Sequence, residues 1–360
     1  MGDAPNAVEE AREAAERAGL RYVSDEEPGI TRRGRGKGFS YYAPGGELLQ
    51  DLEERDRLNA LAVPPAWKDV WICPDPDGHI QATGRDAEGR KQYRYHPDWR
   101  AIRDEGKYAR MSGFGRALAR IRRRTTAHLK SEGLPREKVL AAVVRLLERS
   151  LIRIGNDEYA RSNGSFGLTT LRDRHVAFRG SKVRFEFRGK GGKPHRVEVD
   201  DPLLSAVIRE CREVPGYQLF QYYDEAGEKR AVDSAEVNAY VREIAGDDFS
   251  AKDFRTWAGT IEMAAALMEC RPCEDEGEAN RHVTEAVKRV AERLGNTPAV
   301  CRECYIHPEI VHRYLDGTLA ERLDPGAKPV RFEKVRGLTV RESAVLALLE
   351  AGSPESSEKD

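Results

Sequence analysis

The spacing of hydrophobic positions predicts a strand-rich first part of the chain. Residues 3–19 repeat apolar positions at helical spacing, and an alternating pattern begins at Phe39–Tyr42. Residues 69–96 then alternate with a period of two across turn signals at 75–78 and 86–89. This pattern predicts two or three antiparallel strands after an N-terminal helix.

The pattern becomes helical beyond about residue 105. Two helices are expected from Ser112 to about Gly133 and from Arg136 to Ile152, because Pro135 interrupts a helical apolar period. Four more helices are expected at 202–213, 234–245, 253–268 and 278–294.

Strands are also expected within this second part. A short strand pair is expected around 167–178, and 182–199 reads as a hairpin with the tip GKGGK. The pattern as a whole predicts an α+β protein with three segments. These are a β-rich domain over 1–104, a mainly helical domain with a small sheet over 105–325, and a partly disordered extension over 326–360.

The composition is that of a globular protein with a charged surface. The 360 residues are 39% hydrophobic and 34% charged. No apolar run reaches the roughly 20 residues of a membrane helix, and the N-terminus is acidic where a signal peptide would be basic. We therefore expect a cytoplasmic protein without membrane contact, and its six cysteines to be reduced thiols or metal ligands.

Basic residues are concentrated in two regions although the net charge is only -1. Residues 79–130 contain fourteen Lys or Arg against five Asp or Glu, and residues 172–196 contain nine against two. Two basic regions in a nearly neutral chain favour a polyanion-binding face. Solvated helix surfaces are the alternative explanation.

The cysteines suggest a metal site at first sight. Cys270 and Cys273 form one CxxC pair, and Cys301 and Cys304 form another. The 27 residues between the pairs exceed the usual spacing of about 15–20 in zinc ribbons, and a strong helical period fills the gap. Neither pair follows a strand as a thioredoxin-type motif does. We expect ordinary small side chains here and no bound metal.

Five polar residues stand in distinctive contexts. They are Arg153 in LIRIGNDEYA, Lys190 in FRGKGGK, Arg255 in AKDFRTWAG, Asn296 in LGNTP, and Tyr305 nine residues later. Taken singly, each has an ordinary structural explanation, such as a surface cation or a core aromatic. Together, and in this order, the segments resemble the type IB DNA topoisomerases of the poxvirus-like and bacterial branch. The resemblance covers residues from about 20 to 320.

The resemblance implies a complete catalytic set. IRIG followed by FGLTTLRDRHV resembles the segment of the first catalytic arginine, and KDFRTWAG that of the second. These arginines, Arg153 and Arg255, would stabilise the negative charge of the attacked phosphate. Tyr305 would be the nucleophile and form a 3′-phosphotyrosyl ester, and Lys190 would protonate the leaving 5′ oxygen. Lys193 is a second candidate for this proton transfer.

Asn296 departs from part of the family. Poxvirus-like members carry histidine at this position, whereas bacterial relatives carry asparagine. The amide keeps a neutral hydrogen-bond donor for a phosphate oxygen but has no general-acid role. No metal is expected, because the two arginines can do what metal ions do in two-metal nucleases. No ATP is expected, because one phosphoester is exchanged for another, and no other cofactor is implied.

The same resemblance implies a DNA interface. GRDAEGRKQYRYH resembles the strand of the N-terminal domain that touches DNA, and GRALARIRRRTTAHLK is a basic helix. The candidate DNA-binding residues are Arg90, Gln92, Tyr93, Tyr95, Arg122, Arg123 and Lys252. The tyrosines could equally pack the sheet, and some helix arginines could simply be solvated. The two domains would form a clamp around duplex DNA of the nucleoid, as a monomer.

Two rival functions remain at this point. Tyrosine recombinases share the two arginines, the lysine hairpin and the tyrosine. They usually carry His-x-x-Arg at the second arginine, whereas this chain has Lys-x-x-Arg, from Lys252 to Arg255. A non-catalytic zinc-ribbon DNA-binding protein would instead use the paired cysteines as ligands.

Overall fold

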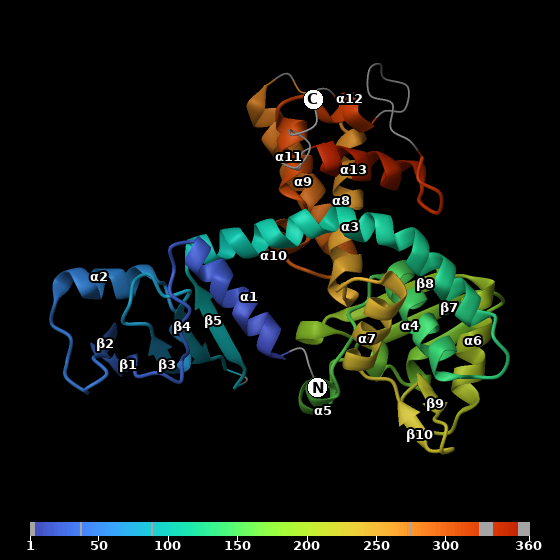
Figure 1. Cartoon of the computed structure of the whole chain (residues 1–360), viewed down its shortest axis with the longest axis horizontal. Coiled ribbons are helices and arrows are strands. Elements are labelled where there is room, and N and C mark those ends of the chain that lie inside the picture. The colour runs from blue at the N-terminus through green and yellow to red at the C-terminus, as the bar shows by residue number, and fades with distance from the viewer. Residues whose placement is uncertain are drawn as a thin grey trace. The chain divides into compact units, whose positions relative to one another are not determined.

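The computed structural model describes residues 4–36, 38–87, 89–271, 273, 275–323 and 334–351. The chain divides into two compact units, Met1–Lys107 and Tyr108–Asp360. The boundary falls inside a long helix, α3 (Pro97–Leu129) (Figure 1). Within the described ranges, no helix is long and apolar enough to cross a bilayer.

The first unit contains a five-stranded antiparallel sheet with the strand order β2-β1-β3-β4-β5. Its elements are α1 (Ala4–Arg17), β1 (Ile30–Arg35), β2 (Gly38–Tyr42), α2 (Leu52–Ala60), β3 (Lys68–Ile72), β4 (Ile80–Arg85) and β5 (Lys91–Tyr95). Ile30, Leu58 and Ile72 belong to the small core between the sheet and α2. The predicted antiparallel sheet is confirmed.

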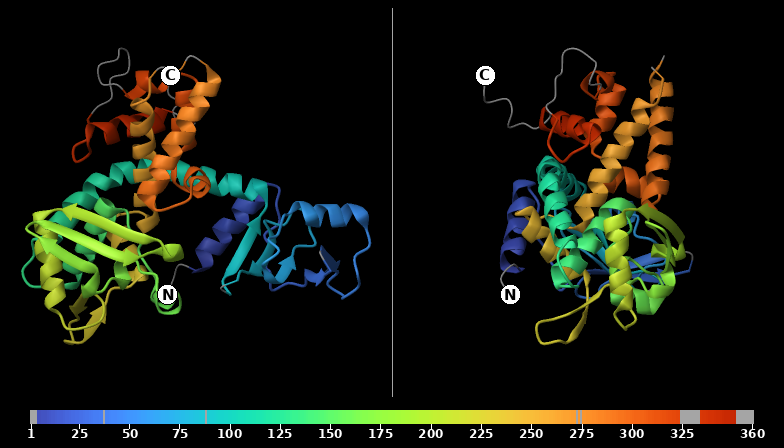
Figure 2. Two further views of the ribbon diagram at one scale, coloured as in Figure 1. Left: turned by 180° about the vertical axis from the view of Figure 1, so that it is seen from behind. Right: turned by 90° about the vertical axis from the view of Figure 1, so that its right-hand side faces the viewer.

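The second unit is mainly helical. Its helices are the rest of α3, α4 (Arg136–Ser150), α5 (Asp157–Asn163), α6 (Pro202–Glu213), α7 (Ser234–Ala245), α8 (Ala251–Met268), α9 (Glu276–Leu294), α10 (Pro298–Tyr305), α11 (Pro308–Leu315), α12 (Leu319–Leu323) and α13 (Val340–Ala351). α4 runs through the core and packs against α6, α7 and α8. α8 and α9 lie side by side (Figure 2).

Two small sheets complete this unit. The strands β6 (Val176–Arg179), β7 (Lys182–Arg188) and β8 (Pro194–Asp200) form an antiparallel sheet in that order, and β9 (Gln221–Tyr223) pairs with β10 (Lys229–Ala231). Leu204 and Ile208 of α6 and Val183 and Phe185 of β7 are buried in the common core, so one face of the larger sheet is covered.

Several predicted elements need correction. The strand pair expected around 167–178 is wrong in its first half, because Leu168–Thr170 and Asp173–His175 form 3₁₀ turns and only the end joins β6. The helix expected from Ser112 begins at Pro97, directly after β5. The helices expected at 202–213 and 234–245 are confirmed. The tail expected to be disordered, 352–360, lies outside the described residues.

Candidate active site

Arg153 is placed by a tight approach of two backbone segments. Leu151 caps the C-terminus of α4 with a left-handed φ of 57°, a conformation that non-glycine residues rarely adopt. Gly167 of a later segment packs directly against Arg153, because a Cβ on this glycine would come within 2.6 Å of the Arg153 carbonyl oxygen. That oxygen accepts a hydrogen bond from the Leu168 amide at 2.9 Å. The FGLTT segment therefore fixes the backbone of Arg153.

Arg255 lies in the second turn of α8 and is only 4% exposed. Its guanidinium donates to the carbonyl oxygen of Leu151 and, at 2.8 Å, to that of Leu294. Burial lowers the pKa of Arg255 from the ordinary arginine value, and the neighbouring Arg153 acts in the same direction. The two arginines therefore lie close enough to create one concentrated positive region.

The C-terminus of α9 holds both arginines. Gly295 ends the helix with a φ of 61°, and its carbonyl oxygen lies 3.5 Å from the guanidinium nitrogens of Arg153. Arg153 also donates to Oδ1 of Asn296, while Arg255 donates to the Leu294 carbonyl. The last carbonyls of a helix have no intrahelical partner and carry partial negative charge. They are therefore suitable acceptors for two cations.

Tyr305 is the last residue of α10 and faces Arg255. Thr297 caps this helix by accepting from the Val300 amide at 3.4 Å, and Pro298 is its first residue. The ring centroid of Tyr305 lies 5.2 Å from Cζ of Arg255, within cation–π range. Gly259 permits this position, because a Cβ there would come within 2.4 Å of the Tyr305 carbonyl oxygen.

Two buried donors in this cluster point to a missing acceptor. The contact with Arg153 directs Oδ1 of Asn296 toward the guanidinium and leaves Nδ2 as the donor of the amide. Nδ2 of Asn296 and Nε of Arg255 are both buried, and no described residue accepts from either. Such donors are rare in folded proteins and call for a specific explanation.

Lys190 occupies a different environment from the other four candidates. It lies exposed at the tip between β7 and β8, where Gly191 and Gly192 have φ values of 73° and 71°. The turn is closed by a 2.8 Å hydrogen bond from the Gly189 amide to the Lys193 carbonyl. Lys193 is exposed as well, so exposure alone does not choose between the two lysines.

A groove of about 650 Å³ adjoins the lysine hairpin and the α9–α10 turn. Lys193, His195, Gly295 and Asn296 line it. The sequence reasoning passed over His195. The only available signal was its place directly after the GKGGKP tip, which does not reveal what a side chain touches.

The candidate DNA-binding residues of the first unit lie on the β4–β5 hairpin. Nε of Arg90 and Nε2 of Gln92 both donate to Asp86, at 2.7 and 2.9 Å. The rings of Tyr93 and Tyr95 stack with centroids 5.8 Å apart. Tyr93 is 40% exposed, whereas Tyr95 packs against a small core cluster. Tyr93 and Tyr95 therefore share one face of β5, whereas Gln92 lies on the other face and is bonded to Asp86.

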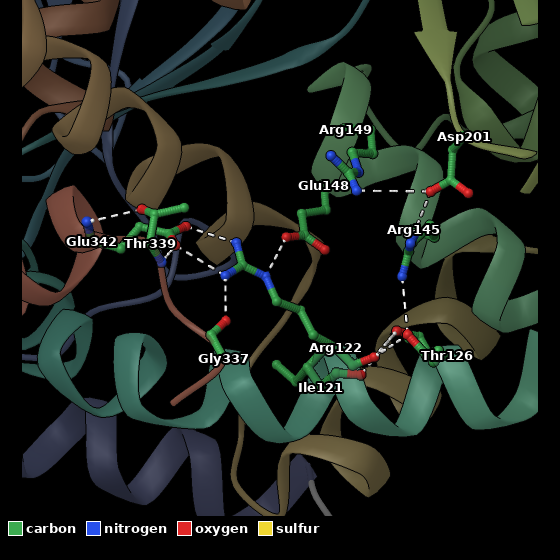
Figure 3. A network of polar contacts seen from close by, with 11 residues as sticks. Ile121, Arg122, Thr126, Arg145, Glu148, Arg149, Asp201, Gly337, Thr339 and Glu342 are labelled. Atoms are coloured by element: carbon green, nitrogen blue, oxygen red, sulfur yellow. Dashed lines mark hydrogen bonds and ion pairs between the residues drawn. The ribbon is translucent and has the colours of Figure 1, made fainter. Parts of the chain in front are cut away.

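Neighbouring arginines of α3 differ sharply. Arg122 donates to Glu148 at 2.7 Å, to Glu342 at 2.7 and 3.0 Å, and to the Gly337 carbonyl at 2.8 Å (Figure 3). Burial alone would lower the pKa of Arg122, but the two carboxylates outweigh burial and raise it. Arg123, by contrast, is exposed. The guanidinium of Arg122 is therefore committed to protein acceptors, and we no longer propose it as a DNA contact.

Lys252 lies exposed in the first turn of α8, one helical turn before Arg255.

The cysteine pairs show no sign of acting as metal ligands. Cys301 is fully buried in the core, and burial raises its pKa to about 11. Cys273 contacts His282 and Tyr314 instead. The described part of the chain contains no group of three or more His, Cys, Asp or Glu side chains that could hold a metal ion.

Comparison with known protein families shows which family the chain belongs to. Residues 96–321, more than half of the chain, match the family described as eukaryotic DNA topoisomerase I, catalytic core. The chain belongs to the type IB DNA topoisomerases. Residues 38–86 of this topoisomerase match the bacterial DNA topoisomerase IB N-terminal domain. It is also similar to DNA topoisomerase 1B of Acanthamoeba polyphaga mimivirus, with 29% identity over 288 residues that cover 77% of this chain and 85% of the relative.

The resemblance predicted from the motifs is therefore confirmed at the level of the family. The family assignment favours a topoisomerase over both rival functions, the tyrosine recombinase and the zinc-ribbon protein. The roles of the individual residues of this topoisomerase stay predictions, supported by their geometry. The matched ranges end before α13, so the helix that carries Glu342 lies outside them.

Proposed function

We propose that this chain relaxes supercoiled duplex DNA by reversible cleavage of one strand through Tyr305, without ATP or a metal ion. The observation that carries the proposal is the convergence of Arg153, Arg255, Asn296 and Tyr305 around buried donors that have no acceptor. A phosphate diester placed beside Tyr305 would supply the missing oxygen atoms.

The proposed reaction exchanges one phosphoester for another. The Tyr305 oxygen attacks phosphorus and loses its proton to solvent, while the bond from phosphorus to the 5′ oxygen breaks. Lys190 gives a proton to that 5′ oxygen, because an unprotonated alkoxide is a poor leaving group. The products are a 3′-phosphotyrosyl ester and a free 5′ hydroxyl, and reversal restores the strand. Rotation of the free end between the two steps releases supercoils.

Charge stabilisation is assigned to the two arginines. Negative charge grows on the non-bridging oxygens as Tyr305 attacks, and fixed cations stabilise it most effectively when they need no reorganisation. Arg153 and Arg255 meet this condition because the carbonyls at the end of α9 already hold them. Asn296 adds a neutral donor to the same oxygens.

The DNA interface is proposed to include both units as a clamp around the duplex, acting as a monomer on nucleoid DNA. Arg90, Gln92, Tyr93 and Tyr95 would contact DNA from the first unit, and Arg123 and Lys252 from the second. Most of the affinity would come from phosphate contacts, so binding should weaken steeply with salt.

The test is relaxation of plasmid DNA of both supercoil signs in EDTA without ATP. We expect the wild-type chain to relax both, and Tyr305→Phe to bind DNA normally but to relax neither. Tyr217→Phe is a matched control, because that ring is 81% exposed and far from the catalytic motifs in sequence. Full activity of Tyr305→Phe would contradict the proposal.

A further inference from the structure

His195 lies between the two parts of the proposed site. It is the second residue of β8, opposite Phe187 in the hairpin register, and its ring stacks on that of Phe187 with centroids 5.1 Å apart and planes 6° from parallel. Phe187 is buried in the core. One face of the imidazole is therefore held by the core of the unit.

The edges of the same ring touch two glycines. A Cβ on Gly189 would come within 2.4 Å of Cδ2 of His195, and a Cβ on Gly295 within 2.8 Å of Cε1. Gly189 directly precedes Lys190, and Gly295 directly precedes Asn296. The imidazole thus fills the space between the lysine hairpin and the turn that carries Asn296.

We propose that His195 is a positioning residue that fixes the lysine hairpin against the α9–α10 turn and so directs Lys190 to the leaving oxygen. This inference rests on the proposed function of the site. Burial lowers the pKa of His195, and Arg153, Arg255 and Lys193 act in the same direction. The ring is thus neutral near pH 7 and adds no charge that would repel Lys190.

The test compares two DNA substrates in single-turnover cleavage. One has the ordinary 5′ oxygen at the cleaved bond, and the other has sulfur in its place. A thiolate leaves without first taking up a proton, because thiols are far stronger acids than alcohols. Cleavage of the sulfur substrate therefore does not need a positioned Lys190, but it still needs Tyr305 and both arginines.

We expect His195→Ala to slow cleavage of the oxygen substrate by about 10²-fold, the cost of a misplacement near 1 Å, and to cleave the sulfur substrate at nearly the wild-type rate. Gly189→Ala, which pushes on the ring from the hairpin side, should show the same selectivity. Glu186→Ala is the control, because this exposed residue pairs with Arg196 and should leave both rates unchanged.

Equal slowing of both substrates by His195→Ala and Gly189→Ala would overturn the inference, and so would unchanged cleavage of the oxygen substrate. Failure of the wild-type chain to cleave either substrate would instead contradict the proposed function. The melting temperature and duplex affinity of each variant are measured as well. Wild-type values would show that a loss of cleavage rate does not come from unfolding.

Discussion

Arg255 and Lys190 both supply positive charge to the proposed site, but the structure places them in opposite environments. Arg255 is 4% exposed and donates to two backbone carbonyls, whereas Lys190 is exposed on a glycine-containing turn. The protein therefore holds the arginine in place before DNA binds, and we expect the lysine to gain its final position only with the DNA. Substitutions in the buried cluster should therefore affect both chemistry and folding, and substitutions at the tip should affect chemistry alone.

The largest effect on rate alone is expected at the hairpin tip. Lys190→Ala should slow strand cleavage by about 10²–10⁴-fold, the usual contribution of a general acid. The melting temperature and duplex affinity should stay close to wild type, because the side chain is exposed. Single-turnover cleavage of labelled duplex measures the rate. If Lys193→Ala had the large effect and Lys190→Ala did not, the two lysines would have to exchange roles.

The buried cluster should lose activity and stability together. Arg255→Ala should slow cleavage by about 10²–10³-fold, as removal of a preorganised donor does. It should also reduce the free energy of unfolding by about 1–3 kcal/mol, because the carbonyls of Leu151 and Leu294 lose their donor.

Denaturant unfolding and single-turnover cleavage measure the two effects of Arg255→Ala. Arg255→Lys is the matched variant, since it retains the charge but lacks the planar fork of donors. A fully stable Arg255→Ala protein would show that the contrast with Lys190 is wrong.

The approach of Tyr305 to α8 provides a sharper test of preorganisation. Gly259→Ala should slow cleavage by about 10²-fold, because the new Cβ would displace the Tyr305 backbone by an ångström or more. Gly113→Ala is the control, since its Cβ would lie at an ordinary 3.5 Å from Phe249 and helix propensity would improve by about 1 kcal/mol. Equal cleavage rates for both variants would show that the contact with Gly259 does not position the tyrosine.

The smallest effects on rate are expected from the neighbouring arginines of α3. Arg123→Ala should weaken duplex binding and reduce the salt slope by about 1, as the loss of one phosphate contact does. Arg122→Ala should leave the slope unchanged but reduce the free energy of unfolding by about 1–3 kcal/mol, because Glu148 and Glu342 lose a charged partner. Binding titrations across salt concentrations separate the two, and the reverse pattern would contradict the assignment.

The sequence predicts the candidate chemistry better than the geometry that supports it. Arg153, Arg255, Asn296 and Tyr305 could be chosen because their segments together resemble those of type IB topoisomerases, and the structure brings these four together. The same motifs say nothing of His195 or Gly259, because what matters there is the approach of a distant backbone to one atom.

Arg122 and Arg123 show a second limit of sequence reasoning. The two residues are identical neighbours in a basic helix, and both read equally well as DNA contacts. Only the packing of α13 against α3 decides which guanidinium meets Glu342. α13 follows a range with little hydrophobic pattern, and no sequence motif predicts its position. Side-chain roles that depend on a tertiary contact of this kind cannot be predicted from local sequence.

The most direct test of the central claim is to identify the covalent bond between protein and DNA. A duplex that loses a short fragment after cleavage traps the intermediate, and mass spectrometry of the digested adduct locates the attached nucleotide. We predict that the peptide containing Tyr305 carries the 3′-phosphoryl end of the cleaved strand. Attachment through another residue, or through a 5′-phosphoryl end, would contradict the proposed mechanism.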